Sequence, residues 1–197
     1  MQFRLIYAGA LYGHSDDERL RERALHVHDI RREFHSQLRK LWRDHPVLAN
    51  SEFNKSGVVG AQPIFPYIRE GFRFIPIANE KNGLICTIEI LLLRDGRPGG
   101  AIADIDNRLK TIFDALRMPK NDLELGSKSS RGKQGPARNE DPFYVVVDDD
   151  KLITHVSVTT DTLLDPVPGV AEDHAVRLVI NVTVRPYHVH MENLAFT

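Results

Sequence analysis

The 197 residues carry 26 Lys and Arg against 27 Asp and Glu, which gives a formal net charge of −1 with neutral histidines. We treat residues 1–197 as one domain, because this length suffices for a single hydrophobic core and no sharp change in composition marks a second. The near-neutral charge excludes a uniformly basic nucleic-acid-binding surface, and no apolar run approaches the roughly 20 residues of a membrane helix.

The N-terminus predicts a cytoplasmic protein, and the cysteine content excludes an intrachain disulfide. Residues 1–6 lack the basic start, long apolar segment and small-residue cleavage site of a secretory signal. Cys86 is the only cysteine, so an intrachain disulfide is excluded. Its apolar neighbours predict a buried, inert thiol in a strand.

A strand and a long helix are predicted first. Strand-forming residues occupy 3–7, and a capping box at 15–18 starts the helix. The apolar stripe of this helix consists of Leu20, Ala24, Val27, Phe34, Leu38 and Leu41. Its other faces carry many arginines, including Arg23, Arg31 and Arg32, mixed with acids, and this mixture favours a solvated surface.

Two strands are predicted in the middle of the chain. Residues 46–66 have weak periodicity and are expected to form a loop that can include one short strand. The strand-like segments 72–77 and 84–93 flank Asn82-Gly83, a pair typical of tight turns. We therefore expect an antiparallel hairpin.

A second helix is predicted after the Gly/Pro-rich connection 94–100. Its inward-facing residues are expected to be Ile105, Leu109, Ile112, Phe113 and Leu116, which fall within one narrow arc. Asp106, Lys110 and Asp114, each four residues apart, should line one edge of that stripe.

The C-terminal part completes an α+β fold. Residues 120–142 are polar and Gly/Ser-rich, which predicts a flexible insertion. Residues 144–147 lead into Asp148-Asp149-Asp150, 152–158 continue as a strand, and 176–184 form the last strand. The order β-α-β-β-α-β-β predicts a mixed or mostly antiparallel sheet packed with two main helices.

The acidic residues of these segments suggest phosphoryl chemistry. Mg²⁺ prefers carboxylate and water ligands and commonly uses one or two protein carboxylates. On one helix Asp104 and Asp106 would point about 200° apart, so Asp104 should precede the helix for the two to converge. On a strand, Asp148 and Asp150 would share one face and Asp149 the other. The plainer alternative is a helix cap with surface ion pairs, and a simple acidic turn at 148–150.

The pattern Asp-x-Asp-Asn-x-x-Lys-x-x-x-Asp-x-Leu, followed by Asp-Asp at the head of a strand, resembles the RusA family of Holliday-junction resolvases. The matching residues are Asp104, Asp106, Asn107, Lys110, Asp114, Leu116, Asp149 and Asp150. The order of elements is also similar over most of the chain. The resemblance implies a RusA-like fold and a Mg²⁺-dependent endonuclease, with Mn²⁺ as a substitute, that acts as a homodimer on branched DNA. It further implies a bacterial or phage protein of recombination or repair.

The resemblance also assigns roles. Asp104, Asp106 and Asp150 would bind the metal, Lys110 would be the basic catalytic residue, and Asp148 and Asp149 are additional candidate acids. Candidate DNA contacts are the basic residues Arg94, Arg97, Lys128, Arg131 and Lys133. The connection to Asp149-Asp150 is longer here than in the family.

Two other functions stay open. One is a noncatalytic DNA-binding protein of the same fold, and the other is a metal-dependent phosphohydrolase of small substrates. His188 and His190 could share a strand face near the C-terminus, but no third metal ligand matches them. No Ser-His-Asp arrangement, phosphate-binding glycine motif or zinc spacing is present.

Overall fold

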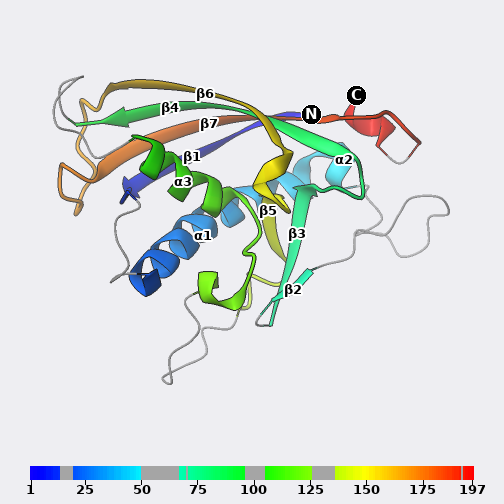
Figure 1. The fold of residues 1–197 in the computed structure, drawn as a ribbon, viewed down its shortest axis with the longest axis horizontal. Coiled ribbons are helices and arrows are strands. Elements are labelled where there is room, and N and C mark those ends of the chain that lie inside the picture. Colours follow the sequence, from blue (N-terminus) through cyan, green and yellow to red (C-terminus); the bar gives the residue numbers. More distant parts are fainter. Residues whose placement is uncertain (14–19, 50–66, 70, 96–104, 126–135, 192) are drawn as a thin grey trace.

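The computed structural model describes residues 1–13, 20–49, 67–69, 71–95, 105–125, 136–191 and 193–197. Within these ranges the chain forms an α+β fold with two mixed sheets and two main helices, as predicted (Figure 1). The first sheet has the strand order β1-β7-β4-β6, and the second has the order β2-β3-β5. No helix of the described residues is long and apolar enough to cross a membrane.

The first sheet contains β1 (Gln2–Ala10), β7 (Ala175–Pro186), β4 (Leu84–Arg94) and β6 (Ile153–Thr162). β1 and β4 are antiparallel to β7, and β6 is parallel to β4. In β4, Ile88, Ile90 and Leu92 are buried, whereas Glu89 and Leu91 are exposed. This alternation is typical of a sheet that packs on one face only.

The two main helices cover that packed face. α1 (Leu20–Asp44) buries Val27, Phe34 and Leu38, so the predicted apolar stripe is confirmed at these positions. α3 (Ile105–Leu116) buries Ile112 and Leu116 in the same core. The short helix α2 (Pro46–Ala49) follows α1, so the prediction of a loop is wrong for the start of 46–66. The prediction that Ile105 packs inward is wrong, because this first residue of α3 is 37% exposed.

The second sheet contains β2 (Tyr67–Arg69), β3 (Phe72–Ala78) and β5 (Phe143–Val147). β2 is antiparallel to β3, and β5 is parallel to β3. All five residues of β5 are buried, since α1 packs against this strand. The backbone N–H of Tyr144 in β5 donates to Nδ1 of His35 in α1 at 2.9 Å.

The predicted hairpin of β3 and β4 is wrong. A tight turn does form at the expected place, where Gly83 has a φ of +59° and its N–H donates to the carbonyl of Glu80. However, β4 pairs with β7 on one side and with β6 on the other, which leaves no free edge for β3. The turn therefore carries the chain from the second sheet to the first.

The segment 144–158 is likewise two strands rather than one. β5 belongs to the second sheet and β6 to the first, and the 3-10 helix η4 (Asp150–Leu152) lies between them. Asp148 and Asp150 therefore do not share a strand face, contrary to prediction. The acidic triplet lies at the corner between the two sheets.

The predicted insertion at 120–142 has structure at its start. The 3-10 helix η3 (Asp122–Leu125) buries Leu125, while residues 126–135 lie outside the described residues. The capping box at 15–18 and most of the expected loop 46–66 also lie outside them. The last strand is confirmed as β7, but it ends at Pro186, so His188 and His190 do not share its face. The short η5 (Leu194–Phe196) ends the chain.

Candidate active site

A pocket of about 450 Å³ opens along one edge of α3. It is enclosed by α1, α3, the turn after α3, η3 and η4, and its lining residues are Arg23, Asp106, Leu109, Lys110, Phe113, Asp114, Arg117, Lys120, Glu124 and Asp150. Four of these side chains are basic and four are acidic. Such a concave, charged site is a candidate for binding a polar ligand.

The helix α3 contributes the predicted row of charged residues. Asp106, Lys110 and Asp114 all line the pocket, as their four-residue spacing indicates. The partly buried side chains of Leu109 and Phe113 line it as well and also pack against the core. The predicted charged edge of the helix is thus confirmed.

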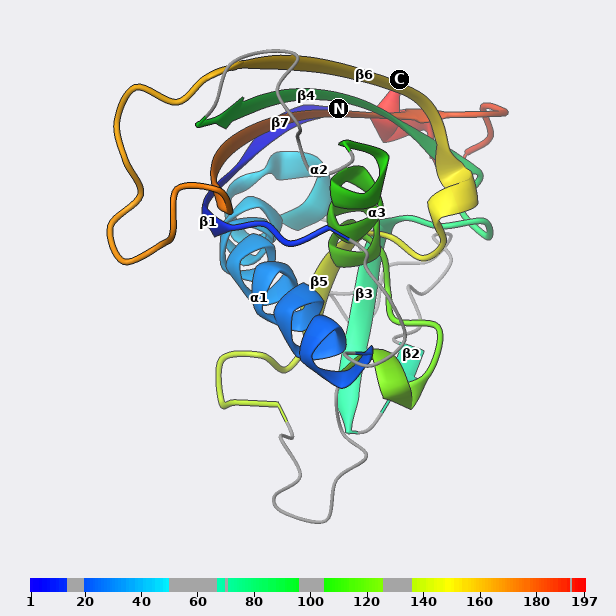
Figure 2. The same cartoon turned by 60° about the vertical axis from the view of Figure 1, so that its left-hand side comes forward.

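Asp150 reaches the pocket through contacts between the end of α3 and the end of β5. Met118 N–H donates to the carbonyl of Val147 at 3.0 Å, and Arg117 forms a parallel bridge with Val147. The chain therefore leaves for the long insertion and returns from it at neighbouring points. As a result η4 lies against α3, as the short yellow helix after β5 in Figure 2 shows.

Asp148 and Asp149 do not line this pocket. One carboxylate oxygen of Asp148 accepts a hydrogen bond from the N–H of Glu80 at 3.3 Å, and burial raises the pKa of this carboxyl. Asp149 caps η4 by accepting from the N–H of Lys151 at 3.0 Å, and this hydrogen bond lowers the pKa of Asp149. Of the three acids in the triplet, only Asp150 lines the pocket.

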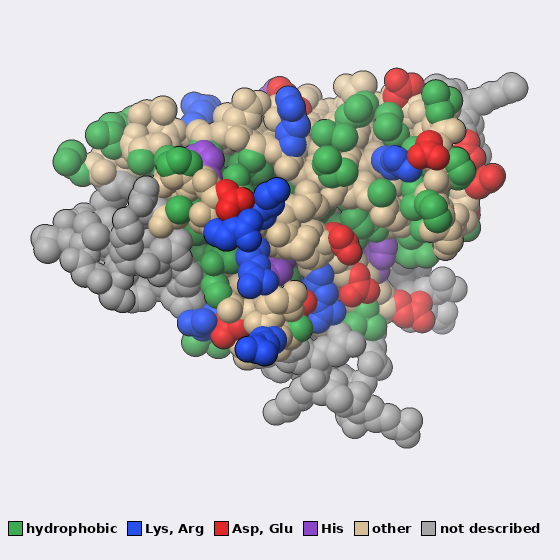
Figure 3. Space-filling model, turned by 180° about the vertical axis from the view of Figure 1, so that it is seen from behind, with side chains coloured by type: hydrophobic (Ala, Val, Ile, Leu, Met, Phe, Trp, Pro, Cys, Tyr) green, Lys and Arg blue, Asp and Glu red, His purple; other side chains and the backbone are tan. Residues whose placement is uncertain are grey.

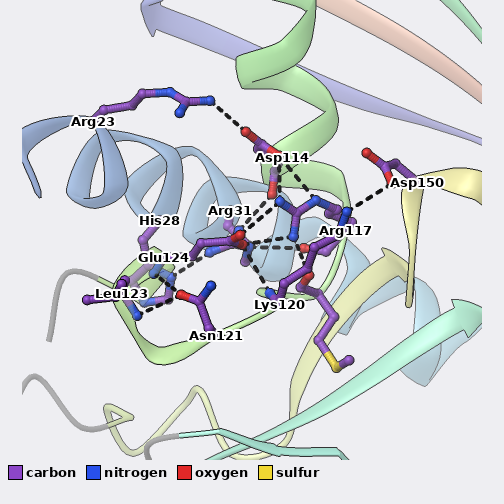
Figure 4. A network of polar contacts seen from close by, with 11 residues as sticks. Arg23, His28, Arg31, Asp114, Arg117, Lys120, Asn121, Leu123, Glu124 and Asp150 are labelled. Carbon is purple, nitrogen blue, oxygen red and sulfur yellow. Dashed lines mark hydrogen bonds and ion pairs between the residues drawn. The ribbon is translucent and has the colours of Figure 1, made fainter. Parts of the chain in front are cut away.

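An arginine-carboxylate network forms the inner wall of the pocket (Figure 4). The Arg117 guanidinium donates two hydrogen bonds to Asp114, at 2.7 and 3.1 Å, and two to Glu124, at 2.8 and 3.1 Å. Arg23 of α1 donates to the other oxygen of Asp114 at 2.7 Å. Burial raises the pKa of Glu124, but the hydrogen bonds from Arg117 and from the N–H of Lys120 outweigh it and hold that pKa below its usual range. Asp114 and Glu124 therefore bind arginines of the protein.

A fully buried arginine of α1 contacts the backbone of this wall. Arg31 of α1 donates to the carbonyls of Asp114 and Arg117 at 2.6 and 3.2 Å, which caps the C-terminus of α3. Burial lowers the pKa of Arg31 to about 10, so it stays charged at neutral pH. Burial, together with the charges of Arg31 and Arg32, lowers the pKa of His28 to about 3. The neutral His28 ring can accept from Arg31, whose Nη1 is 3.2 Å away.

The expectation of a solvated basic surface on α1 holds at Arg39, Lys40 and Arg43, which are exposed, but not at the arginines of this network. Arg31 is 1% exposed, Arg23 binds Asp114, and Arg32 binds Glu140 at 2.8 Å. A signal for Arg31 is present in the sequence, because it lies four residues after Val27 and three before Phe34, inside the apolar stripe.

The face shown in Figure 3 has acidic and basic side chains interspersed among hydrophobic ones.

The outer part of the pocket holds the remaining charged residues. Lys110 is exposed and makes no hydrogen bond or ion pair with the described part of the chain. Lys120 Nζ lies 3.5 Å from Asp150 Oδ1. Asp106, in the first turn of α3, accepts from the N–H of Asn107 at 2.7 Å. Two carboxylates and two ammonium groups therefore stand near the opening.

Several predicted site residues cannot be placed in this pocket. Outside the described residues lie Asp104, Arg97, Lys128, Arg131 and Lys133. Arg94 is described at the end of β4, but it does not line the pocket. Arg117, Lys120 and Glu124 were not identified from the sequence, although they form much of the wall.

The donor set fits a divalent cation with few protein ligands. Asp106 and Asp150 come from separate elements and line the same pocket, and Mg²⁺ often binds through one or two carboxylates and substrate oxygens. Among the described residues no group of three or more His, Cys, Asp or Glu side chains is arranged to hold a metal. Asp104, the third acid that the resemblance assigns to the metal, lies outside the described residues.

Comparisons of this chain with protein-family models, with curated proteins and with solved structures gave no match. We therefore infer function from the pocket, from its charged residues and from the motif that supplies them.

Proposed function

We propose that the protein is a Mg²⁺-dependent endonuclease related to the RusA family, which hydrolyses phosphodiester bonds in branched DNA. The observation that carries this proposal is the pocket in which Asp106, Lys110 and Asp150 meet. These are three of the four residues to which the motif assigns catalysis. Their convergence across a long insertion is a non-local property that the linear motif alone does not contain.

The lining residues have separate roles in the proposed reaction. Asp106 and Asp150, with Asp104, provide carboxylates for Mg²⁺, and Mn²⁺ can substitute because it accepts the same oxygen ligands. When bound, the ion supplies Lewis-acid chemistry for phosphodiester hydrolysis. The exposed ammonium of Lys110, one helical turn from Asp106, can donate to a phosphate oxygen and offset the negative charge that develops there.

The inner network keeps these groups in position. Arg117 connects Asp114 on α3 to Glu124 on η3, so the helix that carries Asp106 and Lys110 is fixed relative to the turn that carries Lys120. Because Asp114 is already bound by two arginines, we assign it a structural role rather than a metal-binding one. Catalytic geometry of this kind depends on side chains that surrounding contacts hold in place.

Branched DNA, a homodimer and a cytoplasmic bacterial or phage setting complete the proposal and derive from the motif's resemblance. Two symmetric nicks in a four-way junction require two sites related by a two-fold axis, which a homodimer provides. The near-neutral net charge indicates that DNA contacts are local. The candidates for these contacts are Arg94, Arg97, Lys128, Arg131 and Lys133.

A phosphohydrolase of small substrates is the second candidate. A pocket of about 450 Å³ lies within the size range of small-molecule sites and could hold a phosphorylated metabolite. Against it, the pocket has only two hydrophobic lining residues, Leu109 and Phe113, for the organic part of such a ligand.

A substrate panel tests the proposal. The wild-type protein is incubated in Mg²⁺ with a synthetic four-way junction, linear duplex, single-stranded DNA and a chromogenic phosphomonoester. We expect paired nicks in the junction and little reaction elsewhere. Hydrolysis of the monoester alone would favour the small-substrate enzyme, and tight junction binding without nicking would favour a noncatalytic DNA-binding protein.

A further inference from the structure

We propose that Lys120 is a second phosphate-binding residue of this site, held by Asp150 until a divalent cation takes over that carboxylate. Neither the motif nor its family resemblance assigns a role to Lys120. The inference rests on the proposed function, because it requires that the pocket bind a cation and a phosphate.

The backbone of Lys120 is fixed by the turn that follows α3. Its N–H donates to Glu124 Oε2 at 3.0 Å, and Glu124 is held by two hydrogen bonds from Arg117. Asn121 Oδ1 accepts from the N–H groups of Leu123 and Glu124, at 3.0 and 3.3 Å, which stabilises the start of η3. The main chain of Lys120 is thus anchored to α3.

The side chain of Lys120 is held much less firmly. It is 50% exposed, and within the described part of the chain its one ion pair joins Nζ to Asp150 Oδ1 at 3.5 Å (Figure 4). Exposed ion pairs with a single long contact contribute little to stability. The ammonium can therefore leave Asp150 easily, while its fixed backbone keeps it within the pocket.

The charges of the lining residues indicate how metal binding changes the attraction of the pocket for phosphate. Among the lining residues, Asp114 and Glu124 pair with Arg23 and Arg117, and the other charged residues are two acids and two lysines: Asp106, Asp150, Lys110 and Lys120. A divalent cation on Asp106 and Asp150 balances both carboxylates and leaves the two lysines in excess. Each bridging phosphate of DNA carries one negative charge, so the metal-bound pocket attracts phosphates more strongly than the metal-free pocket does.

Two opposite effects of removing Lys120 follow. In Lys120→Gln the cation no longer competes with an ammonium for Asp150, so its affinity should rise by about two- to fivefold, the range expected for one exposed ion pair. DNA affinity in the presence of metal should fall, because one phosphate contact is lost. An ion pair with no role in phosphate binding would leave the metal-dependent DNA affinity unchanged.

Lys151→Gln is the matched control. Lys151 follows Asp150 directly and is 56% exposed, but its ammonium pairs with Glu80 at 3.0 Å and does not line the pocket. The two substitutions remove the same charge from side chains that are 50% and 56% exposed. Any difference between them therefore reports the position of Lys120 in the pocket.

The experiment combines metal titration and DNA binding. Mn²⁺ binding is measured by calorimetry on the wild type, Lys120→Gln, Lys151→Gln and Asp150→Asn, and junction binding is measured at several salt concentrations with and without Ca²⁺. We expect tighter Mn²⁺ binding and weaker Ca²⁺-dependent junction binding only in Lys120→Gln. Its plot of log affinity against log salt should be shallower by about one unit with Ca²⁺.

The outcomes separate the two proposals. Equal Mn²⁺ and junction affinities in Lys120→Gln and Lys151→Gln, with metal binding lost in Asp150→Asn, would overturn the role of Lys120 and leave the proposed metal site standing. Equal Mn²⁺ binding by the wild type and Asp150→Asn would overturn the metal site itself, and the role of Lys120 with it.

Discussion

Arg117 is the residue on which the inner wall of the pocket depends most, and its replacement by methionine tests that dependence. Its side chain is 5% exposed and donates four hydrogen bonds to Asp114 and Glu124 and one to the carbonyl of Met118. Methionine can fill a similar space but cannot donate. The substitution would leave two carboxylates, 16% and 29% exposed, without their main partner.

The expected loss of stability depends on the hydrogen bonds that Asp114 and Glu124 keep. Breaking a buried ion pair by removing one partner costs about 3–5 kcal/mol. Here Asp114 keeps Arg23, Glu124 keeps the N–H of Lys120, and both acids are partly solvated. We therefore expect a loss of about 2–3 kcal/mol in the free energy of unfolding, discounted for this solvation. For a chain of this size that corresponds to a decrease in Tm of about 4–12 °C.

Urea unfolding of the wild type and Arg117→Met measures this loss, with Arg43→Met as the control. Arg43 is also paired with an acid, Asp44, but the two side chains are 72% and 48% exposed, so its replacement should change the free energy of unfolding far less. The Arg117 effect should also shrink as the pH falls below the ordinary Glu124 pKa of 4.5, because a lowered acid pKa stabilises the fold only while the acid is ionised. Equal, small effects of the two substitutions would refute the assignment of Arg117 as the support of the pocket.

Three further predictions concern single residues. Lys110→Met should lower the single-turnover rate of junction nicking by about 100-fold with little change in Tm, because an exposed ammonium that stabilises transition-state charge is lost; an unchanged rate would remove Lys110 from the mechanism. The thiol of Cys86 is 0% exposed and burial raises its pKa to about 12, which confirms the predicted buried thiol, so Ellman's reagent at pH 8 should modify it only after urea is added. Burial lowers the pKa of His28 to about 3, so the unfolded chain binds more protons than the folded one as the pH falls below 6.5, and His28 should contribute a loss of about 3 kcal/mol of stability by pH 4. His28→Gln should flatten that part of the stability curve, and a curve identical to that of the wild type would contradict the neutral buried state.

The helix α3 shows how much of the site could be predicted from local sequence. The spacing of Asp106, Lys110 and Asp114 fixes their common edge, since residues four apart on a helix are neighbours. Asp104, which is expected to precede the helix, lies outside the described residues, so its position stays a prediction. The approach of Asp150, in contrast, depends on the contact of Met118 with Val147, which no local pattern indicates.

Local sequence patterns also did not predict the features that depend on sheet pairing or on long-range contacts. Asn82-Gly83 correctly indicates a turn, but it does not determine which strands pair, and β4 pairs with β6 and β7 instead of β3. Glu124 lies in a polar segment that resembles an unstructured loop, and only its contacts with Arg117 give it a fixed place. Arg31 has a readable signal within the apolar stripe, yet its partners are the carbonyls at the end of a distant helix.

The most direct test of the proposed metal-dependent nuclease is the rate of junction nicking across a Mg²⁺ titration in the wild type, Asp106→Asn, Asp150→Asn and Asp161→Asn. Asp161 is an exposed acid on β6 that does not line the pocket, so it controls for the loss of one carboxylate. We predict Mg²⁺-dependent nicking by the wild type and Asp161→Asn, and at least a 100-fold slower reaction, on the order expected for loss of a group that stabilises the transition state, in the other two. Equal Mg²⁺-dependent rates in all four proteins would contradict the assignment of this pocket as the active site.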